Sequence, residues 1–412
     1  GEQIARLLES CGYKTVFAQE NADAFCLNVC TVKGDSTALQ LLRKIQNANS
    51  SAPILLTGCI PPDFEQKLLL ENSNVSLANL DVLRKNPDLL NEWLKGNGFR
   101  ENLKEKTPRI FTPGIAQESP HIGILNISDG CLDACSFCST RLVKGKHRSV
   151  SPEKIFSEAK RYLENGCKEL WLTGQDTSCY GFDIGTNLAE LAKKILEQNS
   201  GDYKIRLGMG NPRHLEKYLD EMLSVYEDER IYKFIHLPVQ SGSVSVLQAM
   251  GRKHNVDTFR KIAEAFISKF SYFTLSTDII VGFPGETRED FEQTCKLISD
   301  LKPSICNITR FVARPNTVAE KLPGKIPGKE QHYRSATLSA LFQKIALENN
   351  ISREGKTARV LTEKSGHRNG TYIARDEAYR SIALKGNYKP GTWLNVQIEK
   401  AETFALLAKE VL

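Results

Sequence analysis

The chain has 412 residues, 41% hydrophobic and 25% charged, which is enough apolar material for about two or three folded domains. Its net charge of +6 permits binding to nucleic acid without requiring it. No apolar run is long enough to span a bilayer and the first residues do not form a signal peptide, so we expect a soluble, cytoplasmic protein without a membrane partner. Eleven cysteines in such a protein indicate metal or redox chemistry before disulfides.

The first hundred residues alternate between helical and strand patterns. The chain opens in a helical pattern, GEQIARLLESCGY, with no capping residue or initiator methionine, so we expect an upstream segment containing a first strand to be absent. The next predicted elements are a strand over 23–30, a helix from Val32, a strand over 52–58 and a helix from Pro62. This alternation predicts a small α/β domain with a parallel sheet over residues 1–100. The polar residues 96–120, rich in Pro and Gly, are typical of a linker.

Strand and helix patterns alternate again over residues 117–350. The six predicted strands cover 122–127, 169–173, 204–209, 233–239, 274–283 and 305–312. Six strand–helix units predict an incomplete (β/α)6 barrel with its chemistry at the C-terminal ends of the strands. A helix over 330–350 leads into residues 352–412, where short β patterns alternate with Gly and Asn turns, and this last segment predicts a small β-barrel.

Three cysteines lie within eight positions directly after the first barrel strand, in DGCLDACSFCSTR. They are Cys131, Cys135 and Cys138. Thiolates are the ligands of iron–sulfur clusters, and three of them on a [4Fe–4S] cluster leave one iron with an open position for a substrate. A structural zinc site is the alternative, but it prefers four ligands, commonly two Cys-x-x-Cys pairs. His147 is a possible fourth ligand, yet it stands in the basic segment KGKHRS, which we expect to be solvated or to face a phosphate.

Six motifs in order along the chain carry a family resemblance. They are GCLDACSFCSTR, LTGQDTSCYGFDIGTNL, RLGMGNPR, HLPVQSGSVSVLQAMGR, TDIIVGFPGET and RFVARPNT. With CxxxCxxC after the first strand of a β/α barrel, the chain resembles the radical S-adenosylmethionine (SAM) superfamily and, within it, the methylthiotransferases. The branch it resembles most acts on N6-threonylcarbamoyladenosine in tRNA, in archaea and eukaryotes. The resemblance implies an N-terminal methylthiotransferase domain, a radical SAM barrel and a C-terminal TRAM domain that binds RNA.

The resemblance also implies the cofactors and their contacts. SAM would chelate the open iron, and its reductive cleavage would give a 5′-deoxyadenosyl radical that takes hydrogen from C2 of the target adenine. Backbone acceptors and a carboxylate suit the ammonium of SAM. The residues that match the family's SAM contacts are Gly174, Gln175 and Asp176 for its amino group, Asn211 and Arg213 for its carboxylate and ribose, Gln240 at the barrel mouth, and Gly282 in GFPGET at the pocket edge.

Two further cysteines, Cys30 in LNVCTVKG and Cys59 in LLTGCIPP, follow predicted strands. The resemblance implies that they ligate a second [4Fe–4S] cluster that carries the sulfur to be transferred, with a third ligand upstream of this chain. Cys11 and Cys26 are substitutes in principle, but their helical and strand contexts favour structural roles. The remaining cysteines, Cys167, Cys179, Cys295 and Cys306, are expected to be small buried hydrophobic residues.

The C-terminal segment from 353 to 412 holds 11 Lys or Arg against 7 Asp or Glu. Basic side chains meet phosphates and aromatic rings stack on splayed bases, so we predict an RNA-binding surface here, although a solvated charged face is the commoner result. The predicted RNA contacts are Arg353, Lys356, Arg359, Arg368, Tyr372 and Arg375.

The predicted function is therefore methylthiolation of C2 of N6-threonylcarbamoyladenosine next to the anticodon of tRNA, with an electron-donor protein as a second partner. Two alternatives change only the substrate, to an aspartate of a ribosomal protein or to an isopentenyl-type tRNA adenosine. A third alternative, an RNA-binding module with a structural metal, does not explain the ordered SAM-type motifs.

Overall fold

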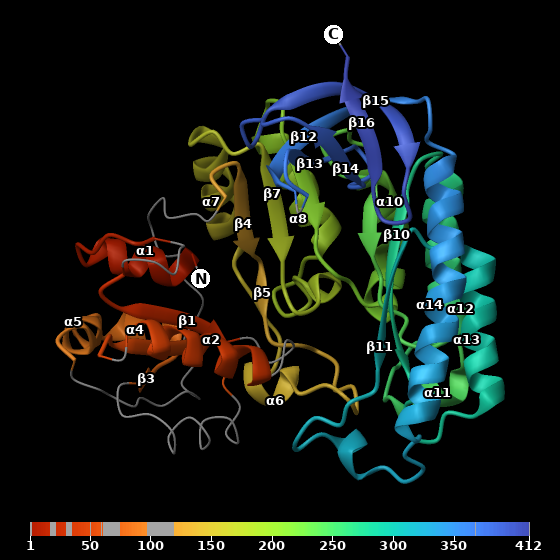
Figure 1. Cartoon of the computed structure of the whole chain (residues 1–412), viewed down its shortest axis with the longest axis horizontal. Coiled ribbons are helices and arrows are strands. Elements are labelled where there is room, and N and C mark those ends of the chain that lie inside the picture. Colours follow the sequence, from red (N-terminus) through yellow and green to blue (C-terminus); the bar gives the residue numbers. More distant parts are fainter. Residues whose placement is uncertain are drawn as a thin grey trace. The chain divides into compact units, whose positions relative to one another are not determined.

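The computed structural model describes residues 2–16, 22–29, 35–49, 51–58, 60, 75–96, 119–366 and 368–411. The chain forms two compact units (Figure 1). The first comprises Gly1–Glu118 with Ser139–Gly145, and the second comprises Ser119–Cys138 with Lys146–Leu412. Within these described residues, no helix has the length and apolar character needed to cross a membrane.

The first unit contains a three-stranded parallel sheet in the order β1-β2-β3, as predicted. Its elements are α1 (Glu2–Ser10), β1 (Phe25–Val29), α2 (Asp35–Ala48), β2 (Ile54–Gly58), β3 (Val75–Leu77), α4 (Leu80–Lys85) and α5 (Asp88–Leu94), with the short α6 (Thr140–Lys144) in the same unit. Successive side chains of a strand point to opposite faces. Ile54 and Leu56 therefore pack with Leu42 of α2, while Leu55 packs with Leu7 of α1 on the other face.

Three predictions for this unit fall outside the described residues. The helix predicted from Pro62 lies in the undescribed segment 61–74, and Cys30 and Cys59 are themselves undescribed.

The second unit contains the predicted barrel, whose six strands are all found. They are β4 (Ile122–Asn126), β7 (Glu169–Thr173), β8 (Lys204–Leu207), β9 (Phe234–His236), β10 (Thr274–Val281) and β11 (Ile305–Arg310). They form two parallel sheets, β4-β7-β8 and β11-β10-β9. An isolated parallel bridge between Ile205 and Ile231 joins the two sheets, and the backbone N–H of Gly210 donates to the carbonyl of His236 at 2.9 Å. The incomplete (β/α)6 architecture is confirmed.

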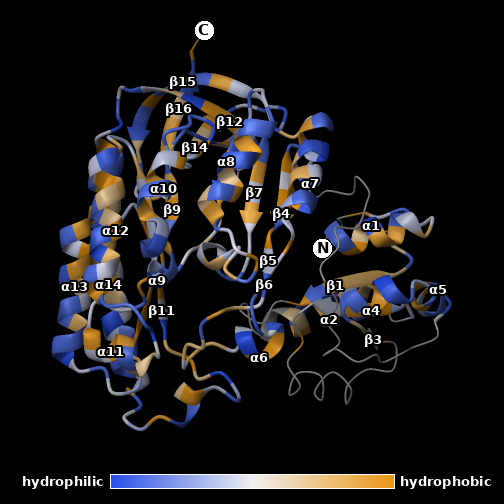
Figure 2. Ribbon diagram, turned by 180° about the vertical axis from the view of Figure 1, so that it is seen from behind, coloured by the Kyte–Doolittle hydropathy of each residue, from blue (hydrophilic) through white to orange (hydrophobic). Residues whose placement is uncertain are grey.

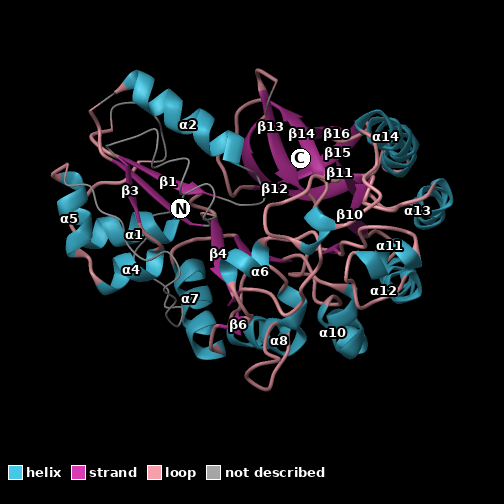
Figure 3. Ribbon diagram, turned by 90° about the horizontal axis from the view of Figure 1, so that it is seen from below, coloured by secondary structure: helices cyan, strands magenta, loops and turns pink. Residues whose placement is uncertain are grey.

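Helices cover the outside of these strands (Figure 3). The longer ones are α7 (Pro152–Glu164), α8 (Leu188–Gln198), α10 (Leu219–Val225), α12 (Val256–Lys269), α13 (Arg288–Leu301) and α14 (Gly328–Ile351). Shorter elements follow the strands: β5 (Ser128–Asp129), β6 (Arg148–Ser149), η1 (Thr177–Cys179), α9 (Pro212–Leu215), η2 (Glu216–Tyr218), α11 (Val244–Ala249) and η3 (Val318–Lys321). Figure 2 shows hydrophobic residues along the strands β4 and β7. Much of α13 is hydrophilic, as expected for a helix that turns only one face to the core.

The C-terminal segment is a closed five-stranded barrel in the order β12-β13-β14-β16-β15. Its strands are β12 (Thr357–Ser365), β13 (Thr371–Arg375), β14 (Ser381–Lys385), β15 (Trp393–Ala401) and β16 (Leu406–Glu410). Val360, Ala374 and Ile382 belong to its apolar core. The predicted small β-barrel is therefore confirmed.

This small barrel packs against the N-terminal ends of the (β/α)6 strands. The buried guanidinium of Arg380 donates to the hydroxyls of Thr274, the first residue of β10, and of Ser304, just before β11. Tyr379 packs with Tyr232 and Phe234 at the start of β9. Because chemistry in such barrels lies at the C-terminal ends of the strands, the small barrel sits at the opposite end. The boundaries 1–100, 117–350 and 352–412 stay predictions, since the contacts group the last two regions into one unit.

Candidate active site

The three cysteines lie in a loop after β5, at the C-terminal end of the barrel. Cys131 forms an isolated bridge with Lys146, and the N–H of Cys138 donates to the carbonyl of Cys135 at 3.1 Å. Ser136 holds the loop in place, because its N–H donates to the carbonyl of Met250 at 2.8 Å and its hydroxyl donates to Ala249. All three cysteines are partly exposed. The loop is therefore anchored while its sulfurs stay accessible.

The chemistry of the cysteine loop fits an iron–sulfur cluster. Burial, with the nearby charge of Asp176, raises the pKa of Cys131 to about 12, so the metal-free thiol keeps its proton until iron displaces it. Within the described part of the chain, no three His, Cys, Asp or Glu side chains converge as the ligands of one ion would. Three thiolates in one loop suit a [4Fe–4S] cluster, whose separate irons take separate thiolates, whereas a structural zinc ion prefers four ligands.

The residues predicted to meet the amino group of SAM follow β7. A Cβ on Gly174 would come within 2.6 Å of the Ser128 hydroxyl, so only glycine lets this turn pass so close to the end of β4. Asp176 is 2% exposed and caps η1, its Oδ1 accepting from the N–H of Ser178 at 3.0 Å. Asp176 Oδ2 and Gln175 Oε1 are buried and have no hydrogen-bond partner among the described residues, although Nε2 of His214 lies 3.9 Å from Asp176 Oδ2. Two unpaired acceptors on adjacent residues suit an ammonium ligand.

Asp133, inside the cysteine loop, was not among the predicted site residues. Its Oδ2 accepts from Nδ2 of Asn211 at 2.6 Å, and its Oδ1 accepts from Nη1 of Arg213. His214 Nε2 lies 3.2 Å from the same Oδ2. Burial alone would raise the pKa of Asp133, but His214 and Arg213 together outweigh burial and lower it to about 2. The loop after β8, with both predicted residues Asn211 and Arg213, is thus tied to the cysteine loop by a carboxylate.

Arg252, the last residue of the motif HLPVQSGSVSVLQAMGR, was also missed. Its Nη1 donates to Sγ of Cys135 at 3.6 Å, and its Nη2 donates to the carbonyl of Pro238 at 2.6 Å. Burial raises the pKa of Cys135, and the guanidinium partly offsets this effect. A lone arginine at the end of a helical pattern gives no sequence signal for such a contact.

The expectation that His147 is solvated or faces a phosphate is wrong. Its side chain is 2% exposed, with Nε2 at 3.1 Å from the hydroxyl of Ser149 and Nδ1 at 3.4 Å from Sγ of Cys179. Burial lowers the pKa of His147. The reason is the β5–β6 pairing, which places Arg148 opposite Asp129 and carries the basic segment onto the barrel. Cys179 is fully buried beside it, as expected of a structural cysteine.

The two remaining predicted cofactor contacts lie after β9 and β10. Gln240 has a left-handed φ of 80°, unusual for a residue with a side chain, and its N–H donates to the carbonyl of Asp278. The N–H of Gly282 donates to the carboxylate of Glu286, and a Cβ there would come within 2.5 Å of Gln331. Both lie at the C-terminal ends of strands, and their contact with SAM stays a prediction.

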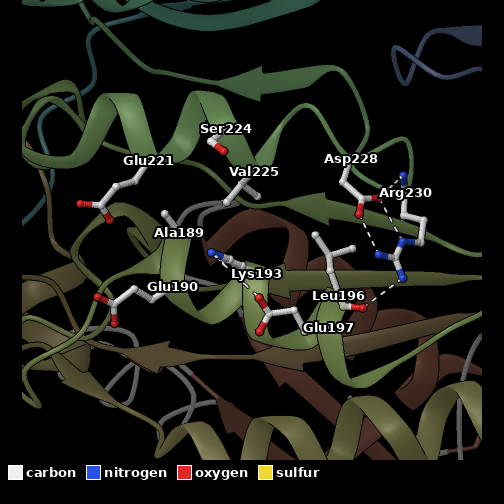
Figure 4. A pocket seen from close by; sticks show the side chains of 10 residues that line it. All are labelled: Ala189, Glu190, Lys193, Leu196, Glu197, Glu221, Ser224, Val225, Asp228 and Arg230. Atoms are coloured by element: carbon white, nitrogen blue, oxygen red, sulfur yellow. Dashed lines mark hydrogen bonds and ion pairs between the residues drawn. The ribbon is translucent and has the colours of Figure 1, made fainter.

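A separate groove of about 550 Å³ lies between α8 and α10, on the outer side of the barrel (Figure 4). It is lined by Ala189, Glu190, Lys193, Leu196, Glu197, Glu221, Ser224, Val225, Asp228 and Arg230. Lys193 pairs with Glu197 and Arg230 pairs with Asp228. Glu190 and Glu221 accept hydrogen bonds from Thr186 and Asn187. None of the predicted site residues lines this groove, so it is not part of the cysteine site.

In the structure, some of the predicted RNA contacts are buried or paired with other side chains, and others are exposed. Tyr372 is 3% exposed and faces the core of the small barrel, so the expectation that its ring stacks on bases is wrong. Arg375 donates to Glu363, Arg359 pairs with Asp202, and Arg353 lies 3.7 Å above the ring of Tyr272. Lys356 and Arg368 are exposed. Strand alternation, which a charge count ignores, decides which residues face outward.

Comparison with known proteins places the chain in a family. Residues 125–298 match the radical SAM superfamily, residues 1–78 match uncharacterized protein family UPF0004, and residues 352–411 match the TRAM domain. A probable threonylcarbamoyladenosine tRNA methylthiotransferase from Pyrococcus horikoshii is 36% identical over 99% of this chain and 95% of its own length. The chain belongs to the threonylcarbamoyladenosine tRNA methylthiotransferase family.

Further relatives agree with this assignment. The probable enzyme of Archaeoglobus fulgidus is 38% identical over 92% of this chain and 88% of its own length, and the human enzyme is 32% identical over 94% and 67%. Among solved structures, the radical SAM methyltransferase TsrM from Kitasatospora setae, with tryptophan and a SAM analogue bound, has a TM-score of 0.53 at 10% identity and covers 75% of this chain and 69% of its own. That likeness concerns the fold alone.

Membership in this family confirms both the resemblance found in the sequence and the predicted enzyme class, a methylthiotransferase. The chain is a radical SAM transferase whose cofactors are a [4Fe–4S] cluster and SAM. The auxiliary cluster at Cys30 and Cys59 concerns residues that the structure does not describe, and their ligand role stays a prediction.

Proposed function

We propose that this protein methylthiolates C2 of N6-threonylcarbamoyladenosine next to the anticodon of tRNA. One observation carries the proposal: the cysteine loop is joined through Asp133 to Asn211 and Arg213, beside the unpaired buried acceptors of Gln175 and Asp176. Such an arrangement suits a cluster whose open iron holds SAM. The proposed substrate follows from the relatives at 32–38% identity, which are named threonylcarbamoyladenosine tRNA methylthiotransferases.

The chain's residues divide the work at this site. Cys131, Cys135 and Cys138 would hold the cluster, which supplies the electron that cleaves SAM. Asp176 and Gln175 would accept hydrogen bonds from the ammonium of SAM, and Arg213 would meet its carboxylate. The protein's part is to bind, orient and exclude water. Cys30 and Cys59 would hold the second cluster and the sulfur for transfer.

We infer that RNA contacts the small barrel through exposed basic residues near the β12–β13 hairpin. Lys364 is 66% and Arg368 74% exposed, and Lys385 is exposed opposite Thr371 in the β13–β14 pair. These residues replace the buried Tyr372 of the sequence-based prediction. A patch of this kind contributes sequence-independent, salt-sensitive affinity for phosphates. We further infer that a separate electron-donor protein reduces the cluster, and that the enzyme works in the cytoplasm, where its tRNA substrate is modified.

The test uses full-length protein reconstituted anaerobically with iron and sulfide, SAM, a chemical reductant and tRNA that carries N6-threonylcarbamoyladenosine. Mass spectrometry of the digested tRNA should show the 2-methylthio nucleoside together with 5′-deoxyadenosine. Cys135→Ala should abolish both products, whereas Cys295→Ala, on α13, should keep them. SAM cleavage without any modified tRNA nucleoside would overturn the proposed substrate, and would turn attention to the ribosomal-protein or isopentenyl-adenosine alternatives.

A further inference from the structure

The turn after α11 is packed against the cysteine loop by its backbone. The Ser136 N–H donates to the carbonyl of Met250 at 2.8 Å, and the Ser136 hydroxyl donates to the carbonyl of Ala249 at 2.9 Å. Gly251 adopts a φ of 69°, and a Cβ at this position would lie 3.5 Å from the carbonyl of Ala134. These contacts fix the backbone position of the next residue, Arg252, relative to Cys135.

The side chain of Arg252 is directed at a thiol rather than at a carboxylate. Its Nη1 donates to Sγ of Cys135 at 3.6 Å, and the bond from Nη2 to the carbonyl of Pro238, at 2.6 Å, holds the guanidinium plane. Its Nε is buried without a hydrogen-bond partner. Among the described residues, Arg252 forms no ion pair within 4.0 Å, in contrast to Arg213 with Asp133 and Arg334 with Glu286. The positive charge is therefore in direct contact with the Cys135 thiol, while it also acts on the Asp278 carboxylate from beyond 4.0 Å.

Hydrogen bonds and positive charge at a cluster thiolate favour the reduced cluster, which carries one more negative charge than the oxidised one. We propose that Arg252 is a positioning residue that raises the reduction potential of the [4Fe–4S] cluster through its bond to Cys135. The inference rests on the cluster of the proposed function, but not on the tRNA substrate. The cluster must be reduced before it can donate an electron to SAM, so a higher potential makes this reduction more favourable.

The test compares full-length, anaerobically reconstituted wild type with Arg252→Gln, Arg252→Lys and the control Arg260→Gln. Arg260 lies on α12 and pairs with Asp300 and Glu264, away from any cysteine contact. Iron content and thermal unfolding are measured first. The midpoint potential of the cluster is then determined by a redox titration followed by electron paramagnetic resonance, without tRNA.

Arg252→Gln should shift the midpoint to a more negative value at unchanged iron content, Arg252→Lys should shift it less, and Arg260→Gln should leave it unchanged. An unchanged midpoint in Arg252→Gln overturns the proposal. If Arg252→Gln loses iron, Arg252→Lys decides: a shifted midpoint supports the role and a wild-type midpoint overturns it. Because no tRNA is present, failure of the proposed substrate would leave these results unaffected.

Discussion

The carboxylate of Asp133 accepts a hydrogen bond of 2.6 Å from the amide of Asn211, 78 positions further along the chain. The other carboxylate oxygen accepts from Arg213. Through Asp133, the cysteine loop and the segment after β8 are held together. A buried, fully paired carboxylate of this kind makes the position of one loop depend on the other.

Replacing Asp133 by Ala should loosen the cysteine loop. The change leaves the Asn211 amide and the Arg213 guanidinium without their acceptor, and removal of one buried partner typically costs about 2–4 kcal/mol. We expect a lower melting temperature and less iron per chain after reconstitution, measured by calorimetry and iron assay. Asp202→Ala, which removes an exposed partner of Arg359, is the control and should retain iron. Full iron content in Asp133→Ala would contradict the linking role.

Asp176→Asn should weaken SAM binding without loss of the cluster. The free Oδ2 is lost as a charged acceptor, while the amide oxygen can keep the cap on Ser178. Loss of one charge-assisted hydrogen bond corresponds to about a tenfold or larger rise in Kd. The change that SAM causes in the cluster's paramagnetic resonance spectrum gives the affinity. Equal SAM affinity in the variant and the wild type would remove Asp176 from the SAM site.

We expect Arg380 to make the largest single side-chain contribution to the packing of the small barrel against the (β/α)6 barrel. It is 9% exposed and donates to Thr274, Asn350 and Ser304. Arg380→Ala leaves these buried groups unpaired and should destabilise the second unit by about 3 kcal/mol. Arg359→Ala breaks an ion pair whose side chains are about half exposed, and should cost less than about 1 kcal/mol. Urea unfolding of both variants tests the difference, and equal losses would contradict it.

Glu169, at the start of β7, should make stability depend on pH. Burial raises its pKa to about 7, with the charge of Glu363 adding to the effect and the hydrogen bond from Trp171 opposing it. This folded-state pKa lies above the unfolded value of about 4.5. The contribution of Glu169 to the free energy of unfolding is therefore fully present below pH 4.5 and is lost as the pH rises through about 7.

Glu169→Gln removes this titration and keeps an acceptor for Trp171. Its unfolding free energy relative to wild type should therefore increase from pH 5 to pH 8, by about 2 kcal/mol at 1.36 kcal/mol per pKa unit. Denaturant unfolding at the two pH values measures the gain. A difference between variant and wild type that does not change with pH would show that Glu169 is ionised in the folded protein.

The basic patch should set the salt dependence of tRNA binding. Changing Lys364 and Lys385 together to Ala should weaken tRNA binding. If both lysines contact phosphates, the magnitude of the slope of log K against log salt concentration should fall by about 0.7–0.9 for each lost contact. Lys160→Ala on α7, with a side chain as exposed as that of Lys364, is the matched control. An unchanged slope in the double variant would place the RNA elsewhere.

Local patterns in the sequence were sufficient for much of the fold. The strand Glu169–Thr173 was predicted with its observed bounds because ELWLT is a short apolar run between polar segments. The placement of the three cysteines in one loop after a barrel strand was also predicted correctly, since their spacing is a local property, and their role as ligands stays a prediction. The predicted strand 233–239 was too long: the Leu237 N–H still donates to the carbonyl of Ser276 in β10, but Pro238 has no N–H to continue the pairing, and β9 ends at His236.

The errors concern contacts between distant segments. His147 looked solvated because its neighbours are basic, but pairing of β6 with β5 buries it. Tyr372 looked available to RNA, but the closure of the small barrel turns its ring inward.

The sequence by itself determined the six barrel strands and the family, and it predicts the cluster ligands, because each depends on residue type and spacing along the chain. Only the tertiary structure decided that Asp133 joins two loops, that Arg252 faces Cys135, and that Arg380 holds the small barrel in place. Those contacts span 30 to 117 positions of sequence, and a pair so distant is brought together by the packing of whole elements, which no local pattern records.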